Sequence, residues 1–579
     1  MQKKIKRRSY SEDVLNQAQF ASLHPVLKRI YAARGIVDTA ELVYGLDQLM
    51  PYHTLLGIEK AAMFLSDAIA QQKRFLIIGD FDADGATATA VAVRALRLFG
   101  AQHVEFLVPN RFEYGYGLTP GIVDMAAQKK PNVIITVDNG ISSHEGVLKA
   151  REYGMDVIIT DHHLAGDTLP EATAIVNPNQ PNDPFMSKAL AGVGVIFYVM
   201  LAVRAQLIQQ KWFETQSLPL PNMGNLLDLV ALGTVADVVP LDRNNRILVY
   251  QGLKRIQAGQ CSRGIIVLLQ VAKKDYQKIN ATDLGFSIAP RLNAAGRLDD
   301  MSLGIHCLLT DDSEEAFHDA EELDALNRER QLIEKDMHQQ ALTAMDALAI
   351  DPRYLPSGIS LYDPSWHQGV IGILAGRIKD KFYRPVIAFA DSTQEGELKG
   401  SGRSIPGVHI RDVLDTIAKK HPHILEKFGG HAMAAGLSIK KPHFSDFEKA
   451  FRIAVKTALK DEEPRSEVWT DGALRPEELN LDFAAILREA GPWGQHFPEP
   501  LFDGYFTLHR HYLLQGKHVK MSLGFEDTPL VIDAIAFNVD ERSRPDARTK
   551  KIYAVYKLDI NEYQGRRTLQ LLIEDFQVS

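Results

Sequence analysis

Three short apolar runs in the first third of the chain each end in an aspartate. They are Phe75-Leu-Ile-Ile-Gly-Asp80, Asn132-Val-Ile-Ile-Thr-Val-Asp138 and Asp156-Val-Ile-Ile-Thr-Asp161. Runs of this length that close on a turn signal are typical of buried strands. The segments between them, such as 86–99 and 121–130, have the length and composition of helices. Strands that alternate with helices predict an α/β fold with a parallel sheet.

The polar side chains that follow these runs are predicted to meet, because ligands of open α/β sheets bind beyond the carboxyl ends of the strands. The first run opens into the turn Asp80-Phe-Asp-Ala-Asp84, and the third leads into two histidines. A further strand-like run, Val104-Glu-Phe-Leu-Val-Pro, ends in a polar pair. The side chains expected in one crevice are Asp80, Asp82, Asp84, Asn110, Asp138 and His162.

The crowded carboxylates of the first turn predict a metal site, because they repel one another unless a cation neutralises them. Oxygen ligands of this kind favour Mg²⁺ or Mn²⁺. Two such cations about 4 Å apart clamp the attacking and leaving oxygens of an in-line displacement at phosphorus. For this turn alone, a solvated acidic loop is the alternative. A calcium loop of the EF-hand type is excluded, because Val91 stands where that loop needs a bidentate glutamate.

Asp237 and the tandem histidines are further candidates for the same chemistry. Asp237 closes an apolar, helix-like segment shortly before Pro240. The helix dipole disfavours an acid there, so Asp237 is either a metal ligand or a salt-bridged surface residue. His162 and His163 point in different directions, as adjacent residues at a strand end do. One imidazole can bind a metal while the other donates a proton or hydrogen bond to a phosphate, although a structural role is the usual alternative for a histidine.

A phosphate substrate also needs cationic and amide donors. One arginine side chain can bind two phosphate oxygens at once, and glycines let backbone N–H groups approach an anion closely. Each candidate is weak evidence on its own. A Gly-Gly-His segment, for example, is usually only a turn. The candidates are Arg111, Arg291, Asn293, Arg297, Arg403, Ser404, Gly429, Gly430 and His431.

Composition restricts the class of protein. The formal net charge of −8 gives no global sign of a polyanionic partner, so any nucleic-acid surface must be a local basic patch. Two cysteines without a CxxC pair argue against a disulfide framework and a zinc ribbon. The basic segment Met1–Arg8 precedes no apolar region and is not a secretory signal. We expect it to be a solvated tail rather than a phosphate-contacting arm.

No apolar stretch approaches the roughly 20 residues that span a bilayer. We therefore expect a cytoplasmic protein that has no membrane partner.

At 579 residues, the chain is expected to form three or four domains. We predict an N-terminal segment, 1–70, that packs on a catalytic parallel-sheet domain, 71–310. A stretch without Gly or Pro, 311–350, predicts a connecting helix about 50 Å long. A second α/β domain is expected over 351–460. Five short strand-like segments within 461–579 predict a small β-barrel of the OB type.

The predicted barrel contains aromatic and basic residues that suit a single nucleic-acid strand. For any single aromatic, a place in the barrel core is the alternative. The residues concerned are Tyr505, Phe506, Tyr512, Tyr556 and Tyr563 with Lys517, Lys520, Arg566 and Arg567.

Together these residues resemble the DHH phosphoesterase superfamily, whose name comes from the motif present here as Asp161-His162-His163. The resemblance is closest to the RecJ branch, the single-stranded-DNA-specific exonucleases, and covers nearly the whole chain. Its motifs include Gly79-Asp-Phe-Asp-Ala-Asp-Gly85, Val108-Pro-Asn-Arg111, Thr136-Val-Asp-Asn-Gly140, Gly233-Thr-Val-Ala-Asp-Val-Val-Pro-Leu241, Pro290-Arg-Leu-Asn-Ala-Ala-Gly-Arg297, Trp366-His-Gln-Gly-Val-Ile-Gly372, Gly400-Ser-Gly-Arg-Ser404 and Gly491-Pro-Trp-Gly-Gln-His-Phe-Pro-Glu-Pro-Leu-Phe502.

The resemblance implies a DHH domain, a long helix, a DHH-associated domain and an OB-fold. It implies processive 5′→3′ degradation of single-stranded DNA to 5′-mononucleotides, with two Mn²⁺ or Mg²⁺ ions. It also implies a setting in DNA recombination and repair, beside a single-strand-binding protein and a helicase, and we expect a monomer.

The resemblance also assigns roles to individual residues. His163 would contact the scissile phosphate and act in catalysis together with Asp84 and Asp138. The 5′ end would be held by Arg403, Ser404, Gly429, Gly430 and His431. The metal ligands would be Asp80, Asp82, Asp84, Asp138, His162 and Asp237.

Other functions compete with this interpretation. A different DHH phosphoesterase would act on short oligonucleotides, cyclic dinucleotides, pyrophosphate or polyphosphate, but the length and the predicted barrel favour a long polymer. A non-catalytic DNA-binding scaffold would be expected to lack metal ligands, and every proposed ligand is present. A dinucleotide-binding dehydrogenase is disfavoured, because the first strand delivers carboxylates and lacks the GxGxxG turn.

Overall fold

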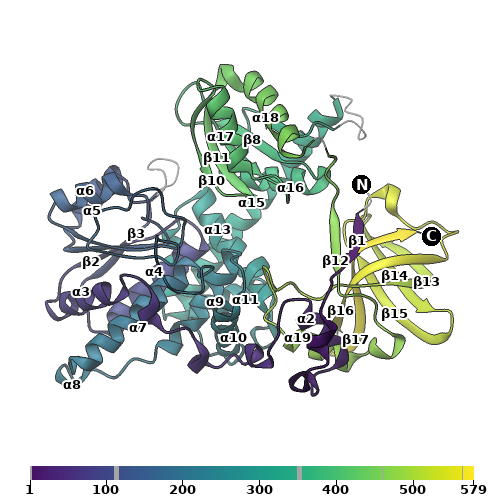
Figure 1. Cartoon of the computed structure of the whole chain (residues 1–579), viewed down its shortest axis with the longest axis horizontal. Helices are drawn as coiled ribbons and strands as arrows, with labels where there is room; N and C mark the ends of the chain where they lie inside the picture. Colours follow the sequence, from purple (N-terminus) through teal and green to yellow (C-terminus); the bar gives the residue numbers. More distant parts are fainter. Residues whose placement is uncertain (1–2, 110–116, 348–354, 461, 564, 579) are drawn as a thin grey trace.

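The computed structural model describes residues 3–109, 117–347, 355–460, 462–563 and 565–578. Figure 1 shows a domain built on a sheet at the left, a second α/β domain at the top and a β-barrel at the right. Helices fill the centre, between the first sheet and the barrel. The predicted mixture of a parallel-sheet domain, a long helix, a second α/β domain and a barrel is confirmed.

The first sheet is entirely parallel, with the strand order β3-β2-β4-β5-β6. Its strands are β2 (Phe75–Ile78), β3 (Val104–Leu107), β4 (Val133–Val137), β5 (Asp156–Thr160) and β6 (Ala174–Val176). The chain runs from β2 to β3 at one edge and then returns to β4 on the other side of β2. The strand order therefore reverses between β2 and β4, which is where ligands bind in open sheets.

Helices cover both faces of this sheet, which explains why its strands are continuous apolar runs rather than alternating ones. Phe75 and Ile77 of β2 pack into the core formed with α3 (Ile58–Ala70), α4 (Ala83–Leu98) and α7 (Gly192–Gln209). Leu76 and Ile78 face α5 (Pro120–Gln128) and α6 (His144–Glu152).

Among the described residues, α7 is the one helix long and apolar enough to cross a membrane by length and composition. Of its residues, 67% are buried, and it packs against α3, α4 and α9. The apolar composition of α7 is therefore that of a core helix.

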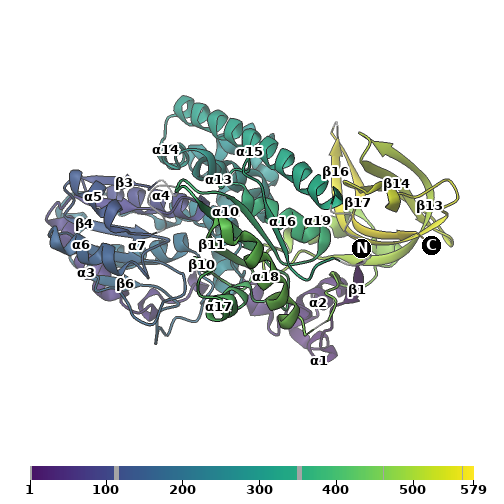
Figure 2. The same cartoon turned by 90° about the horizontal axis from the view of Figure 1, so that it is seen from above.

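A cluster of helices follows the sheet. It contains α9 (Leu227–Ala236), α10 (Arg243–Gln257), α11 (Arg263–Val271), the π-helical turn η7 (Leu284–Ile288) and α13 (Ala289–Leu298). Shorter helices are α1 (Glu12–Leu15), α8 (Trp212–Thr215), α12 (Ala281–Asp283) and α14 (Ser302–Leu309). The long helix α15 (Ser313–Ala347) then runs from α14 toward the barrel side of the molecule, as Figure 2 shows from above.

The second α/β domain has a mixed sheet with the order β10-β11-β9-β8-β7. Its elements are β7 (Ile359–Tyr362), α16 (Ile371–Phe382), β8 (Val386–Asp391), β9 (Glu397–Arg403), α17 (Ile410–Lys420), β10 (Leu425–Gly430), β11 (Ala434–Lys440) and α18 (Phe444–Ala458). An ion pair of 2.8 Å between Arg377 on α16 and Glu334 on α15 ties the domain to the long helix.

The barrel closes in the order β13-β14-β15-β17-β16. It consists of β13 (Phe502–Leu514), β14 (His518–Phe525), β15 (Thr528–Ala536), β16 (Lys551–Tyr563) and β17 (Arg566–Val578), preceded by α19 (Leu481–Glu489). The expected division among its aromatics is visible in the burial. Phe506 and Tyr556 lie in the core, whereas Tyr505 and Tyr512 are exposed.

The N-terminal segment divides between two parts of the molecule. The helix α3 packs against α7, but β1 (Lys4–Arg7) pairs in parallel with β12 (Glu467–Thr470), and α2 (Pro25–Ala32) contributes Tyr31, which stacks on Trp493. The expectation that all of residues 1–70 pack on the catalytic domain is therefore wrong for β1 and α2. The expected solvated tail is wrong as well, because Arg7 binds the buried Asp503 of the barrel at 2.6 Å.

Candidate metal centre

The acidic turn after β2 is held by its own backbone. Asp82 caps the N-terminus of α4, and its Oδ1 accepts hydrogen bonds from the N–H groups of Asp84 at 2.9 Å and Gly85 at 3.0 Å. Gly85 has no room for a side chain, because a Cβ atom there would lie 2.5 Å from the carbonyl oxygen of Asp80. The turn is therefore tight, and it presents its carboxylates at the end of the strand.

Asp84 is buried against the N-terminus of α7. Its two carboxylate oxygens accept hydrogen bonds from the N–H groups of Gly192 at 2.7 Å and Val193 at 2.9 Å. Burial raises the pKa of Asp84 to about 7, and the charge of Asp82 adds to the effect. A Cβ atom at Gly192 would lie 2.6 Å from the Cβ of Asp138, so only glycine allows both aspartates to pack here.

Asp161 organises the two histidines that follow it. Its Oδ1 accepts hydrogen bonds from the backbone N–H groups of His162 at 2.7 Å and His163 at 3.1 Å. The same oxygen lies 2.7 Å from Nδ1 of His163. Its Oδ2 accepts a hydrogen bond from the backbone N–H of Ile141 at 2.9 Å. Burial by itself would raise the pKa of Asp161, but the hydrogen bond and charge of His163 lower it. Asp161 is thus an ionised anchor for the turn.

The two imidazoles differ in charge. Burial lowers the pKa of His162 to about 4, and the charge of His163 contributes, so His162 is neutral and its ring nitrogen can act as a ligand. For His163, burial opposes protonation, but the hydrogen bond and charge of Asp161 outweigh it and raise the pKa to about 9. His163 is therefore a cation near neutral pH.

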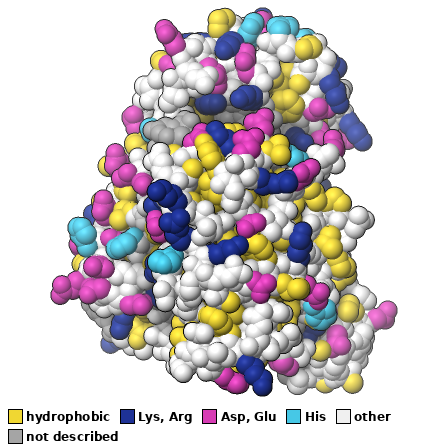
Figure 3. Space-filling model, turned by 90° about the vertical axis from the view of Figure 1, so that its left-hand side faces the viewer, with side chains coloured by type: hydrophobic (Ala, Val, Ile, Leu, Met, Phe, Trp, Pro, Cys, Tyr) yellow, Lys and Arg dark blue, Asp and Glu magenta, His cyan; other side chains and the backbone are white. Residues whose placement is uncertain are grey.

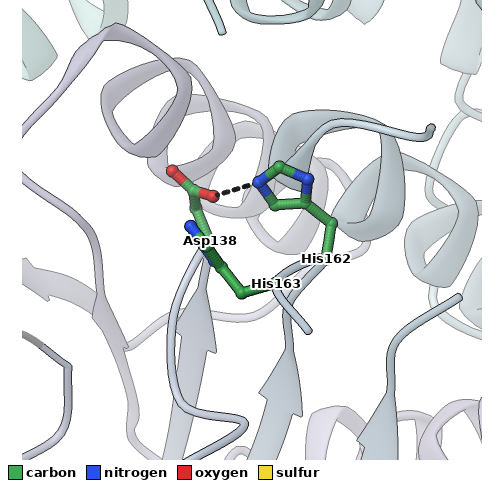
Figure 4. Close-up of side chains that lie close together, drawn as sticks. All are labelled: Asp138, His162 and His163. Carbon is green, nitrogen blue, oxygen red and sulfur yellow. Dashed lines mark ion pairs between the residues drawn. The ribbon is translucent and has the colours of Figure 1, made fainter. Parts of the chain in front are cut away.

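The imidazole of His162 points at two of the acids. Its Nε2 lies 3.1 Å from Oδ1 of Asp138, the contact drawn in Figure 4, and 3.5 Å from Oδ2 of Asp237. Asp138 directly follows β4 and has a left-handed backbone, with φ of 62°. Asp237 caps the C-terminus of α9.

Three overlapping groups of these side chains each bring their ligand atoms within 4.8 Å of one another. The groups are Asp138, His162 and His163; Asp84, His162 and Asp237; and Asp80, Asp82 and Asp138. Burial raises the pKa values of Asp138 and Asp237 well above their usual range, and repulsion from the neighbouring carboxylates adds to the shift. Carboxylate oxygens with one neutral imidazole suit a hard divalent cation, so the donor set fits such ions.

The predicted phosphate-binding residues of α13 support the structure around the turn. The Oδ1 of Asn293 accepts a hydrogen bond from the N–H of Ala83 at 2.8 Å, so this side chain props the acidic turn. Arg291 is bound by Asp324 of α15 at 2.8 Å. Arg297 donates to the carbonyl of Gly369 at 3.2 Å and so joins the two α/β domains.

His431, from the second α/β domain, lies opposite the centre. Its ring centroid is 6.3 Å from that of His163. Burial and the charge of His163 lower the pKa of His431. In the same domain, Gly430 has a backbone φ of 141°. Ser404 is buried, and its hydroxyl donates a hydrogen bond to the carbonyl oxygen of Val408. Arg403 donates a hydrogen bond to the carbonyl oxygen of Gly402. Gly429 precedes this turn in β10, and the predicted Asn110 and Arg111 lie outside the described residues.

Several residues that shape the centre are absent from the predicted set. Asn179 donates to the carbonyl of His162 at 2.6 Å, and Asn177 donates to that of His163 at 2.9 Å. Gly192 and Val193 supply the N–H groups that hold Asp84. Of these residues, only Gly192 could have been noticed in the sequence. Together with Gly194 it opens an apolar helix, and glycine is a poor helix former.

Family models match the three domains of this structure. Residues 74–234 match the DHH family, N-terminal domain; residues 354–460 match the DHHA1 domain; residues 470–575 match the RecJ OB domain. Over 555 residues, 96% of either chain, the sequence is 52% identical to the single-stranded-DNA-specific exonuclease RecJ of Escherichia coli. The chain belongs to the RecJ family.

Solved RecJ structures agree in fold. RecJ of Thermus thermophilus in complex with Mn²⁺ matches with a TM-score of 0.81 at 29% identity, covering 100% of this chain and 80% of that one. The same protein in complex with Mg²⁺ matches with a TM-score of 0.76 at 28% identity, covering 100% of this chain and 78% of that one. The resemblance noted from the RecJ motifs is thereby confirmed.

Proposed function

We propose that this chain is a single-stranded-DNA-specific exonuclease that hydrolyses phosphodiester bonds with two Mn²⁺ or Mg²⁺ ions. The observation that carries the proposal is the gathering of five aspartates and a neutral histidine where the strand order of the sheet reverses. The names of the RecJ relatives support the substrate, and the ions in their solved structures support the cofactor. We further propose 5′→3′ polarity, processive action and release of 5′-mononucleotides.

The proposed metal ligands are Asp80, Asp82, Asp84, Asp138, His162 and Asp237. When bound, the cations supply Lewis acidity and an acidified water. The protein itself contributes a fixed arrangement of acids, because the backbone N–H groups of the acidic turn and of α7 hold Asp82 and Asp84. In our proposal the turn needs no rearrangement to receive the ions.

His163 is proposed to bind the scissile phosphate. Its Nδ1 lies 2.7 Å from Oδ1 of Asp161, which keeps the ring protonated, and in our proposal the imidazolium donates to a phosphate oxygen of the bound strand. A charge-assisted hydrogen bond of this kind favours the developing negative charge of a phosphoryl transition state. His431 lies on the opposite side and, with Arg403 and the Gly429-Gly430 turn, is proposed to hold the 5′ end of the strand.

Selectivity for a single strand is proposed to be steric. The centre lies between two α/β domains, with His163 and His431 only 6.3 Å apart between ring centroids. On the face shown in Figure 3, positive and negative side chains are interspersed. The described residues of this face therefore form no single positive patch that would attract nucleic acid. A site recessed between two domains admits one strand and excludes a duplex.

We also propose a cytoplasmic monomer that works in DNA recombination and repair, beside a single-strand-binding protein and a helicase. This setting rests on family membership. The clustered acids, both histidines of the DHH motif and His431 all come from one chain, which supports the monomer.

One assay tests the proposal. Single-stranded DNA of increasing length, labelled at the 5′ or the 3′ end, is incubated with and without Mn²⁺. We expect Mn²⁺-dependent release of 5′-labelled mononucleotides, little cleavage of blunt duplex, and no release by an Asp82→Asn variant. Equal cleavage of duplex and single strands would refute the steric account. Activity confined to dinucleotides would instead favour a DHH phosphoesterase of short substrates.

A further inference from the structure

Phe286 has the largest exposed fraction, 80%, among the large apolar side chains of the described residues. It lies in η7, a single π-helical turn between α12 and α13. Such turns are rare in proteins, and those that occur are often found at functional sites. A phenylalanine exposed to this extent gains little free energy from burial in the folded protein. Its position therefore suits contact with a ligand that has an apolar face.

The segment that carries Phe286 packs against elements of the metal centre. The preceding residue, Gly285, sits 3.3 Å from Val235 of α9, as measured from its ideal Cβ position. Val235 is two residues from Asp237, the proposed ligand at the end of α9. The element that carries Phe286 continues into α13, whose Asn293 props the acidic turn. The chain before and after Phe286 therefore contacts elements that carry the centre.

A second exposed apolar side chain lies along this route. Val238 directly follows Asp237, is 64% exposed and has a left-handed φ of 59°. A β-branched residue rarely adopts that conformation, and strained backbone of this kind clusters at ligand clamps and active sites. Exposed apolar side chains thus occur both beside the centre and in η7.

Arginine side chains flank Phe286. The guanidinium of Arg291 donates to the carbonyl of Ser287, the residue after Phe286, and to the buried Asp324 of α15. Asp324 also binds Arg328, whose side chain is 71% exposed. One buried carboxylate therefore fixes two arginines beside the exposed ring, and the pair retains a net positive charge.

We infer that Phe286 is a base-stacking platform for the DNA strand on the 3′ side of the scissile bond, with Arg328 and Arg291 attracting a flanking phosphate. This inference rests on the proposed nuclease function. An exposed aromatic ring beside fixed cations is the combination that binds single strands without sequence preference, because every base has a π-face. The 5′ end is proposed to lie at His431 of the second α/β domain, so we assign the strand beyond the scissile bond to the first domain, which carries Phe286.

The direction agrees with the overall architecture. In Figures 1 and 2, α13 lies between the first sheet and the barrel. A strand that follows α13 away from the first sheet can therefore reach the barrel, where Tyr505 and Tyr512 are exposed.

The test compares Phe286→Ala, Phe286→Leu and Phe286→Trp on a single-stranded 20-mer with Mn²⁺. For Phe286→Ala and Phe286→Leu we expect KM to rise about 5- to 100-fold while kcat stays within threefold, because stacking on one base supplies affinity of that size. Phe286→Trp should stay within threefold of wild type in KM. Ile453→Ala, which removes another exposed apolar side chain, 64% exposed and on α18, should change neither constant.

A spectroscopic measurement locates the base. 2-Aminopurine is placed at successive positions of the strand, in an Asp138→Asn background that leaves the DNA uncut. We expect quenching at one position 3′ of the cleaved bond and loss of that quenching with Phe286→Ala. If the wild type degrades the strand but Phe286→Ala keeps the same KM and quenching, the platform is refuted. If the wild type degrades no strand, the nuclease function itself fails.

Discussion

Asp161 shows how a residue outside the proposed ligand set governs the centre. One carboxylate oxygen receives two backbone N–H groups and the ring of His163, so it fixes the direction of both imidazoles. It also keeps His163 protonated. Partners that orient ligands in this way typically contribute 10- to 100-fold to metal affinity or activity.

We therefore predict that Asp161→Asn lowers kcat/KM on single-stranded DNA by about 10- to 100-fold. The amide has the same shape, but it removes the negative charge that holds the imidazolium. Steady-state kinetics with saturating Mn²⁺ measure the effect, and circular dichroism checks that the fold is retained. A variant with kinetics within twofold of wild type would show that Asp161 is dispensable.

The crowded acids also predict how pH acts on the metal-free protein. The pKa of Asp84 is raised to about 7 in the folded chain, so folding favours its protonated form. The folded state then binds more protons than the unfolded state, and stability falls as pH rises through that range. We expect the Tm in EDTA to increase from pH 8 to pH 6.

Mn²⁺ should raise the Tm most at pH 8, because there it neutralises ionised carboxylates. A thousandfold excess over Kd stabilises by about 4 kcal/mol. Differential scanning fluorimetry measures both effects, and Asp84→Asn should show a smaller gain in EDTA on acidification. An identical gain in that variant would assign the pH effect to other groups.

At the scale of elements, β1 is a structural clamp. Its Arg7 reaches the fully buried Asp503 on β13, which also accepts hydrogen bonds from Thr470 on β12 and Tyr553 on β16. Burial alone would raise the pKa of Asp503, but these hydrogen bonds lower it, so the carboxylate is ionised. One side chain thereby joins four strands.

We predict that Asp503→Ala destabilises the protein by about 3 kcal/mol, because it leaves the partners of a buried charge unsatisfied. Chemical denaturation measures the loss, and limited proteolysis near the N-terminus should become faster. The matched control is Arg151→Ala, which breaks the exposed pair with Glu171 and should cost less than about 1 kcal/mol. Equal losses in the two variants would contradict the clamp.

The clustering of Asp80, Asp138 and His162 could be predicted from the sequence because each follows an apolar run, and parallel strands bring their carboxyl ends together. Sequence reasoning missed Asn177, Asn179 and the N–H groups of α7, because loops and helix ends far along the chain supply them. The position of β1 was also missed, because its partner is in the second half of the chain. Phe286 was missed because an apolar residue in a helical pattern is normally read as core.

At the scale of the whole molecule, two domains meet at the proposed site. The first contributes the acids and His163, the second contributes His431, and Arg297 joins them through the carbonyl of Gly369. A Cβ atom at Gly369 would lie 2.3 Å from the carbonyl of Arg297, so the domains meet closely at this point. The contact sets the separation across which a nucleotide must fit.

If the second domain holds the 5′ end, a strand with a 5′-phosphate should be degraded with a lower KM than one with a 5′-hydroxyl. We predict that His431→Ala raises KM for the phosphorylated strand about tenfold and removes this preference, since a hydrogen bond to a charged group contributes about 1.5 to 3 kcal/mol. Parallel kinetics on both strands measure the effect. A preference that survives in His431→Ala would place the phosphate elsewhere.

The pairing of β1 with β12 has a consequence during synthesis. Arg8 and Trp469, which are hydrogen-bonded in the finished protein, are 461 residues apart. At about 5 to 20 residues per second, a ribosome needs roughly 25 to 90 s to make that stretch. The strand β1 therefore waits without its partner while the intervening domains are made. The clamp on the barrel closes only after both α/β domains have left the ribosome.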